Sequence, residues 1–200
     1  NIVVCDQDNN TQNAVTAIDL TVRTPDVLAQ QPLPASNYTV TYYTSEPLAL
    51  GGLFPIIPAT NYTASTTQRI WVRVEDNITG CYNIGSFDII INIPLSLSTP
   101  TPLSLCDDDT NPNDQFHSFD LTVRDALITQ GLPGYTVTYY STYALAQAAG
   151  VSDIADFTNY TNEDTGVQTL GVLVTSAAGC TSVTTLDIRV LPIPTPNTTP

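Results

Sequence analysis

The chain has 200 residues and a formal net charge of −14, carried by 16 Asp and 3 Glu against five Arg and no Lys. Apolar residues make up 42% of it, near the globular norm, which excludes a disordered acidic tail. The lack of clustered Lys and Arg excludes nucleic acid as a partner, and no apolar run is long enough to span a bilayer, so we expect no direct membrane insertion.

The elements predicted in chain order are mostly short strands. A helical stretch at Pro25–Gln30 is followed by strands at 38–43, 69–75 and 87–94, and later by a strand at 135–140, a helix at Thr142–Ala149 and a strand at 186–190. The strands alternate with period two; Ile70, Val72 and Val74, for example, share one face. β-branched and aromatic residues fill these runs, and Gly, Asn, Asp and Pro separate them.

The chain is an internal repeat. Cys5-Asp6 recurs as Cys106-Asp107, and Tyr38–Tyr43 (YTVTYY) recurs as Tyr135–Tyr140. Three further ordered matches (DLTVR, Gly-Cys and Ile/Leu-Pro) keep an offset of about 100 residues, which is typical of tandem units. We therefore predict two domains, residues 1–97 and 98–200, joined by a stiff Pro-rich linker at 94–102.

About seven short strands in each 100 residues predict an all-β protein of two tandem immunoglobulin-like β-sandwich domains. Each unit has one early and one late cysteine, and no Cys/His spacing suits zinc. Of the three possible connectivities, the simplest pairs the cysteines within each unit, Cys5–Cys81 and Cys106–Cys180. Each bond would stabilise the folded state by about 4 kcal/mol through the loop that it closes. Four buried free thiols are the alternative.

An Asp/Asn-rich loop follows each early cysteine. Oxygen side chains at alternate positions of a tight loop can converge on Ca²⁺, although the EF-hand signature is absent. The predicted ligands are Asp6, Asp8, Asn10 and Asp19 in the first unit, and Asp107, Asp109, Asn111, Asp114 and Asp120 in the second. The alternative is a cluster of Asn/Asp turns without a cation. If bound, the ion would be a structural cofactor.

The ordered set of motifs resembles a known family. Cys-Asp-x-Asp, Phe119–Thr122, Tyr-x-Val-Thr-Tyr-Tyr, Trp71–Glu75 and Thr79–Tyr82 are similar to the repeats of very large Bacteroidetes surface proteins of the gliding-motility adhesin SprB type, exported by type IX secretion. The family's loop has Asp-Gly before an aromatic residue, where this chain has Asp114-Gln115-Phe116. The resemblance implies an extracellular, cell-surface adhesin segment, attached through parts outside the chain.

No catalytic constellation is evident, so we predict no enzyme. His117 and Ser118 are successive strand residues that point to opposite faces and cannot form a triad with Asp120. Trp71, flanked by Arg69 and Arg73, is a weak candidate for sugar binding; its alternative is stacking between the two Arg. The two hypotheses are a stalk segment, with neighbouring repeat units and a surface polysaccharide or substratum as partners, and a carbohydrate-binding module pair using Trp71 and surface Tyr.

Overall fold

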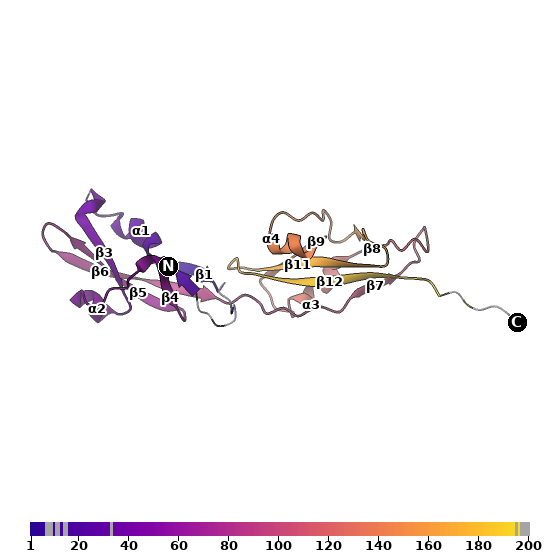
Figure 1. The fold of residues 1–200 in the computed structure, drawn as a ribbon, viewed down its shortest axis with the longest axis horizontal. Helices are drawn as coiled ribbons and strands as arrows, with labels where there is room; N and C mark the ends of the chain where they lie inside the picture. Colours follow the sequence, from indigo (N-terminus) through magenta and orange to yellow (C-terminus); the bar gives the residue numbers. More distant parts are fainter. Residues whose placement is uncertain (7–9, 11–12, 14–15, 33, 195, 197–200) are drawn as a thin grey trace. The chain divides into compact units, whose positions relative to one another are not determined.

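The computed structural model divides into two units, Asn1–Pro94 and Leu95–Pro200. It describes residues 1–6, 10, 13, 16–32, 34–194 and 196. The predicted boundary lay between residues 97 and 98. Each unit is β-rich, and the two share the same order of strands and α-helices (Figure 1). No helix among the described residues is long and apolar enough to cross a membrane.

The first unit contains six strands, two short α-helices and three 3₁₀ helices in its described residues. In chain order these are β1 Ile2–Cys5, β2 Thr16–Ile18, η1 Leu20–Arg23, α1 Thr24–Leu28, η2 Ala35–Asn37, β3 Tyr38–Tyr43, α2 Glu46–Gly51, η3 Ala59–Asn61, β4 Tyr62–Ala64, β5 Gln68–Asp76 and β6 Tyr82–Asn92.

The second unit repeats this pattern with fewer 3₁₀ turns among its described residues. Its elements are β7 Leu103–Cys106, β8 Ser118–Phe119, η4 Leu121–Arg124, α3 Asp125–Ile128, β9 Tyr135–Tyr140, α4 Tyr143–Ala148, β10 Tyr160–Thr161, β11 Val167–Ser176 and β12 Thr181–Leu191. The helices expected at 25–30 and 142–149 correspond to α1 and α4; α2 and α3 were not expected.

In its described residues, each unit has one four-stranded and one two-stranded sheet. The larger sheets have the orders β1-β6-β5-β3 and β7-β12-β11-β9, and the smaller ones pair β2 with β4 and β8 with β10. Six strands in this arrangement, rather than seven, leave the predicted immunoglobulin-like topology unestablished; what the structure shows is two similar β-rich domains. The first strand of each unit runs parallel to the last, β1 beside β6 and β7 beside β12, whereas the other pairs are antiparallel.

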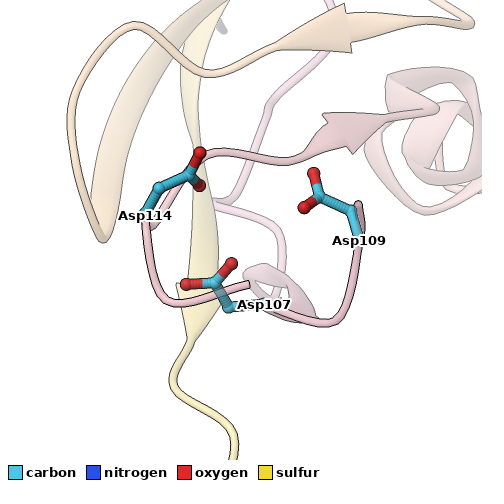
Figure 2. A group of neighbouring side chains, drawn as sticks. All are labelled: Asp107, Asp109 and Asp114. Atoms are coloured by element: carbon cyan, nitrogen blue, oxygen red, sulfur yellow. The ribbon is translucent and has the colours of Figure 1, made fainter. Parts of the chain in front are cut away.

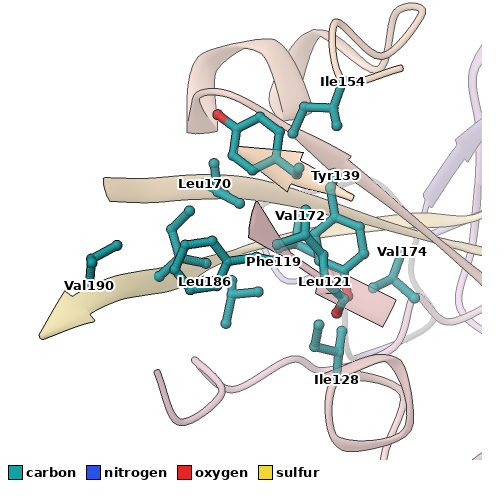
Figure 3. Close-up of a cluster of buried hydrophobic side chains, with 12 residues drawn as sticks. Phe119, Leu121, Ile128, Tyr139, Ile154, Leu170, Val172, Val174, Leu186 and Val190 are labelled. Atoms are coloured by element: carbon teal, nitrogen blue, oxygen red, sulfur yellow. The ribbon is translucent and has the colours of Figure 1, made fainter. Parts of the chain in front are cut away.

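The predicted inward faces form the cores. Ile70 and Val72 are buried in the first unit, and Leu186, Ile188 and Val190 in the second. Figure 3 shows how the second core brings the two sheets together, with Phe119 of β8 against residues of β11 and β12. This packing removes apolar surface from water on the inner face of both sheets, which is the main stabilising contribution.

The outer face of each large sheet is covered at one end by a helix. Tyr43 and Tyr140, which the period-two pattern places outward, are therefore only 2% exposed. In the second unit α4 lies directly on β11, because Gly171 has no side chain: a Cβ there would lie 2.2 Å from the Thr142 carbonyl oxygen and 2.8 Å from the Ala146 Cβ. Close backbone approach is the use of a glycine inside a strand.

The predicted Pro-rich linker is largely part of the second unit. Leu95 and Leu97 pack against the second core, and the alternating Ser96 is exposed. Ser182 Oγ donates to the Leu95 carbonyl (2.6 Å), and Arg124 donates to the carbonyls of Thr101 and Pro102. This segment packs on the second unit because a Leu-x-Leu alternation lies among its Ser and Pro residues and supplies an apolar face.

Substituting Gly171 with Ala should destabilise the second unit. The added Cβ would force α4 away from β11, and overpacking of this kind costs about 1–3 kcal/mol. Gly150→Ala is the control, because nothing lies within 4 Å of a Cβ at that position. Urea denaturation followed by hydrogen exchange of β11 peptides reports the effect; equal stability of the two variants would contradict the close packing.

Candidate functional site

The loop after β7 gathers three carboxylates. Oxygens of Asp107, Asp109 and Asp114 all lie within 4.8 Å of one another (Figure 2). Asp107 is fully buried, Asp109 is exposed and Asp114 is half-buried. Among the residues that the structure describes, these three are the group that could hold a metal ion.

The loop is shaped by hydrogen bonds onto these carboxylates. Asp107 continues the β7 ladder, because its N–H donates to the Leu191 carbonyl (2.8 Å), and its Oδ2 accepts from the Gln115 N–H (2.9 Å). Asp109 Oδ1 accepts from the Asn111 N–H (2.9 Å). Asp114 accepts from the Asn111 side-chain amide (2.6 Å) and, through Oδ1, from the Phe116 N–H (2.9 Å). Each carboxylate is therefore held in place by the loop.

Gln115 turns the chain back beneath the cluster. Its φ of 65° lies in the left-handed region, which an L-residue other than Gly adopts at a cost of about 1–2 kcal/mol. This is the position at which the resembling family has glycine. The Gln115 carbonyl accepts from the buried Asn162 amide (2.8 Å), which fixes the turn from the other side.

The other predicted ligands fall into two groups. Asn111 orients Asp109 and Asp114 through its N–H groups, and its role as a ligand stays a prediction. Asp19 and Asp120 are helix caps: each Oδ1 accepts from the backbone N–H and the hydroxyl of the Thr two residues later. The sequence shows an aligned acid at both positions but not the 3₁₀ turn that uses it.

The first unit's loop is described only in part. Asp6 is fully buried like Asp107, and its N–H donates to the Asn92 carbonyl (2.8 Å), so the two are structural counterparts. Asn10 is exposed. The predicted ligand Asp8 lies outside the described residues.

The cysteines are not paired within the units. Cys5 and Cys180 are disulfide-bonded, whereas Cys81 and Cys106 are exposed free thiols. The predicted bonds Cys5–Cys81 and Cys106–Cys180 are therefore wrong.

The strand register gives the physical reason. Cys5 pairs with Asn92 at the end of β6, and Cys81 immediately precedes the start of that strand at Tyr82. Eleven strand residues span about 33 Å, far beyond the ~7 Å between Cα atoms that a disulfide tolerates. In the second unit Cys106 pairs with Leu191 and Cys180 precedes β12 in the same way.

Trp71 is half-buried and lies opposite Tyr43 in the β3–β5 ladder. The expected stacking on Arg73 is not what the structure shows, because the Arg73 guanidinium lies 3.3 Å from the centre of the Tyr82 ring. Arg73 also donates to the Ala49 and Leu50 carbonyls at the end of α2 and so holds this helix on the sheet. Sugar binding by Trp71 stays a prediction.

His117 contacts both main-chain and side-chain groups. Its ring Nδ1 lies 2.9 Å from the Ser118 carbonyl oxygen, and its Nε2 lies 3.7 Å from Asp108 Oδ1. Its N–H donates to the Asn162 side-chain oxygen (2.7 Å). These contacts bring no nucleophile to the ring.

The pKa of Asp125, in the second unit, is shifted by its surroundings. Burial raises the pKa of Asp125, which accepts a 2.6 Å hydrogen bond from the buried Tyr139 hydroxyl. Burial and this carboxylate also raise the pKa of Tyr139. The first unit has Thr24 and Tyr42 at the equivalent positions, joined by a 2.7 Å hydroxyl–hydroxyl bond without a charge.

Asp125 should make the second unit less stable as the pH rises. Its folded pKa lies above the unfolded value near 3.9, so the stability it contributes is complete below that value and is lost as the pH rises through the folded pKa. Asp125→Asn, which keeps the acceptor for Tyr139, should remove this loss in denaturation curves measured from pH 3 to 8.

Asp156→Asn is the control of opposite sign. Hydrogen bonds from Thr158 lower the pKa of Asp156, so its contribution is present above about pH 4 and is lost as the pH falls through the folded pKa. Parallel pH profiles for wild type and Asp125→Asn would contradict the assignment.

Comparisons with known proteins identify a family. The family model described as "Flavobacterium inter-domain disulphide bond domain" (FIDD) matches twice, over residues 1–95 and 102–194. No curated protein matches the chain.

Solved structures give only weak likenesses. The human desmocollin-1 ectodomain is 13% identical over 82% of this chain and 35% of that one, and PcdhgB3 EC1-4 is 8% identical over 80% and 40%; both have a TM-score of 0.23. The chain thus spans less than half the length of either structure, and scores this low carry no argument about its fold. On the family match, the chain belongs to the FIDD family and contains two tandem copies of its domain.

Proposed function

We propose that the chain is a stalk segment of a large bacterial cell-surface adhesin, in which disulfide bonds fasten each repeat unit to the next. The observation that carries this proposal is the distribution of the cysteines. One bonded cysteine lies in each unit, Cys5 in the first and Cys180 in the second, while Cys81 and Cys106 keep free thiols.

The partner of Cys5 follows by elimination. The chain has four cysteines, and two of them are free. The two that remain are Cys5 and Cys180, so the bond joins an early cysteine of one unit to the late cysteine of the following unit. The family's description as an inter-domain disulphide bond domain supports this pairing.

The parallel strand register makes such bonds suited to a linear array. Each unit carries its early cysteine at one end of the sheet and its late cysteine at the other, about 33 Å away along the last strand. In a longer array, Cys81 would bond the early cysteine of a preceding unit, and Cys106 the late cysteine of a following one. Exposed thiols in a disulfide-containing protein are expected to find partners of this kind.

The mechanical consequence is a second covalent path along the stalk. The peptide chain joins the units at residues 94–95, and the proposed disulfide joins them again between Cys5 and Cys180. Two connections restrict hinge motion, and tension applied between units is borne by covalent bonds rather than by the sheets.

The adhesin role adds partners and a location. Disulfide bonds persist outside the cytoplasm, which supports a position on the cell surface. The neighbouring repeat units are the partners of this segment, and a surface polysaccharide or substratum is the partner of the whole protein during gliding and attachment. Similarity to gliding-motility adhesins supports this assignment. The role is mechanical rather than enzymatic. No contact described for Trp71 favours the carbohydrate-binding alternative over it.

Disulfide mapping tests the proposal directly. Digestion of the oxidised chain without reduction, followed by mass spectrometry, should yield a linked peptide pair containing Cys5 and Cys180. Cys81 and Cys106 should be alkylated under native conditions because both are exposed. Cys106→Ser is the control and should leave the linked pair unchanged. A Cys5–Cys81 peptide pair would refute the proposal.

The location and role are tested in cells that produce the full-length protein. Antibodies raised against the two units should label intact cells, and deletion of the gene should reduce attachment to glass. Labelling only after cell lysis would contradict the surface location, and unchanged attachment would contradict the adhesin role without affecting the disulfide pairing.

A further inference from the structure

The buried carboxylate Asp107 is incompletely satisfied. Its Oδ2 accepts the Gln115 N–H, but its Oδ1 is buried and accepts no hydrogen bond from any described residue. A buried carboxylate oxygen without a partner is costly, and native proteins pair such groups with donors or metal ions. Asp107 is 0% exposed, so bulk water does not replace the missing partner.

Two further carboxylates converge on Asp107. Figure 2 shows Asp109 and Asp114 on either side of it, around the space that the loop encloses. Their hydrogen bonds with Asn111 and Phe116 use one lone pair of each accepting oxygen. A carboxylate oxygen has two lone pairs, so all three residues can still supply ligands.

In the part of the chain that the structure describes, no Arg side chain is paired with this group. The chain contains no Lys, and its five Arg are engaged elsewhere among the described residues: Arg23 with Asp26, Arg69 with Asp88, Arg73 with Glu75, Arg189 with Asp187, and Arg124 with the carbonyls of Thr101 and Pro102. The loop's basic side chain, His117, lies beside Asp108, which is outside the cluster.

We infer that the second unit binds one Ca²⁺ ion through Asp107, Asp109 and Asp114. Calcium takes oxygen ligands at 2.3–2.6 Å, so ligands on opposite sides of the ion are about 4.6–5.2 Å apart. The three carboxylates, within 4.8 Å of one another, fit this spacing. Magnesium requires a tighter, octahedral shell and usually keeps several water ligands. This irregular group of carboxylates therefore suits magnesium less well than calcium.

The ion would stiffen one end of the sheet. Asp107 directly follows Cys106 and extends the β7–β12 ladder, so an ion held there ties the loop of residues 108–114 to the last strand. The free Cys106 thiol would then project from a fixed position. This inference does not depend on the disulfide proposal, because all three ligands belong to one unit.

Calcium titration of the intact chain tests the inference. The protein is freed of metal with a chelator and titrated calorimetrically with CaCl₂ or MgCl₂ in 150 mM NaCl, which screens diffuse attraction. The second unit should bind one Ca²⁺ at least tenfold more tightly than Mg²⁺. Asp109 is exposed, so the Asp109→Asn variant should keep the fold. Its affinity for this Ca²⁺ ion should fall at least tenfold.

Asp108→Asn is the matched control. It removes the same charge from the same loop, but Asp108 is not one of the converging residues, and calcium binding should stay within twofold of wild type. Equal losses in Asp108→Asn and Asp109→Asn, or no calcium heat for wild type, would overturn the inference.

Asp107→Asn provides a readout that does not depend on affinity. In chelator its melting temperature should equal or exceed that of wild type, because the substitution removes an unpaired buried charge. In millimolar Ca²⁺ wild type should melt several degrees higher than in chelator, and the variant should show no shift. A calcium-induced shift in Asp107→Asn as large as in wild type would show that this site is not the one.

Discussion

The parallel pairing of the first and last strands of each unit is the constraint on which the rest of the structure depends. Because β1 runs alongside β6, the chain leaves β1 at the same end of the sheet where β6 finishes, at Asn92. The β5–β6 turn, with its cysteine Cys81, lies at the far end. A unit built in this way cannot close its own disulfide. It presents one cysteine at each end instead, as the proposed head-to-tail covalent array requires.

The same register places the acidic loop. Asp107 is the first residue beyond β7, and its hydrogen bond to Leu191 extends the ladder by one step, which draws its carboxylate into the protein. The loop must then return over this buried charge, and it does so with Gln115 at positive φ. The cysteine and the acidic cluster therefore share one end of the unit. A cation would stabilise the segment through which the units are proposed to be linked.

Local features of this fold were readable from the sequence, and pairing in space was not. Period-two patterns predicted the strand at Tyr38–Tyr43 and the buried faces, because one side of a strand meets the core. The same pattern does not reveal whether neighbouring strands run parallel or antiparallel. It therefore does not show that Cys5 and Cys81 lie at opposite ends of the sheet, and it could not exclude a bond between them. Aligned acids likewise do not reveal that Asp120 caps a helix while Asp107 is buried. That difference depends on where the backbone turns, and no residue spacing encoded it.

Extension of the single chain under force tests the central claim most directly. The chain is pulled from its two ends in oxidising buffer and again after reduction. A Cys5–Cys180 bond encloses about 170 residues in a loop that the applied force does not extend, so the oxidised chain should show no unfolding steps. The reduced chain should then release up to about 600 Å as both units unfold. Unfolding steps of the oxidised chain, with only about 75 residues hidden in each unit, would indicate bonds within the units and contradict the account.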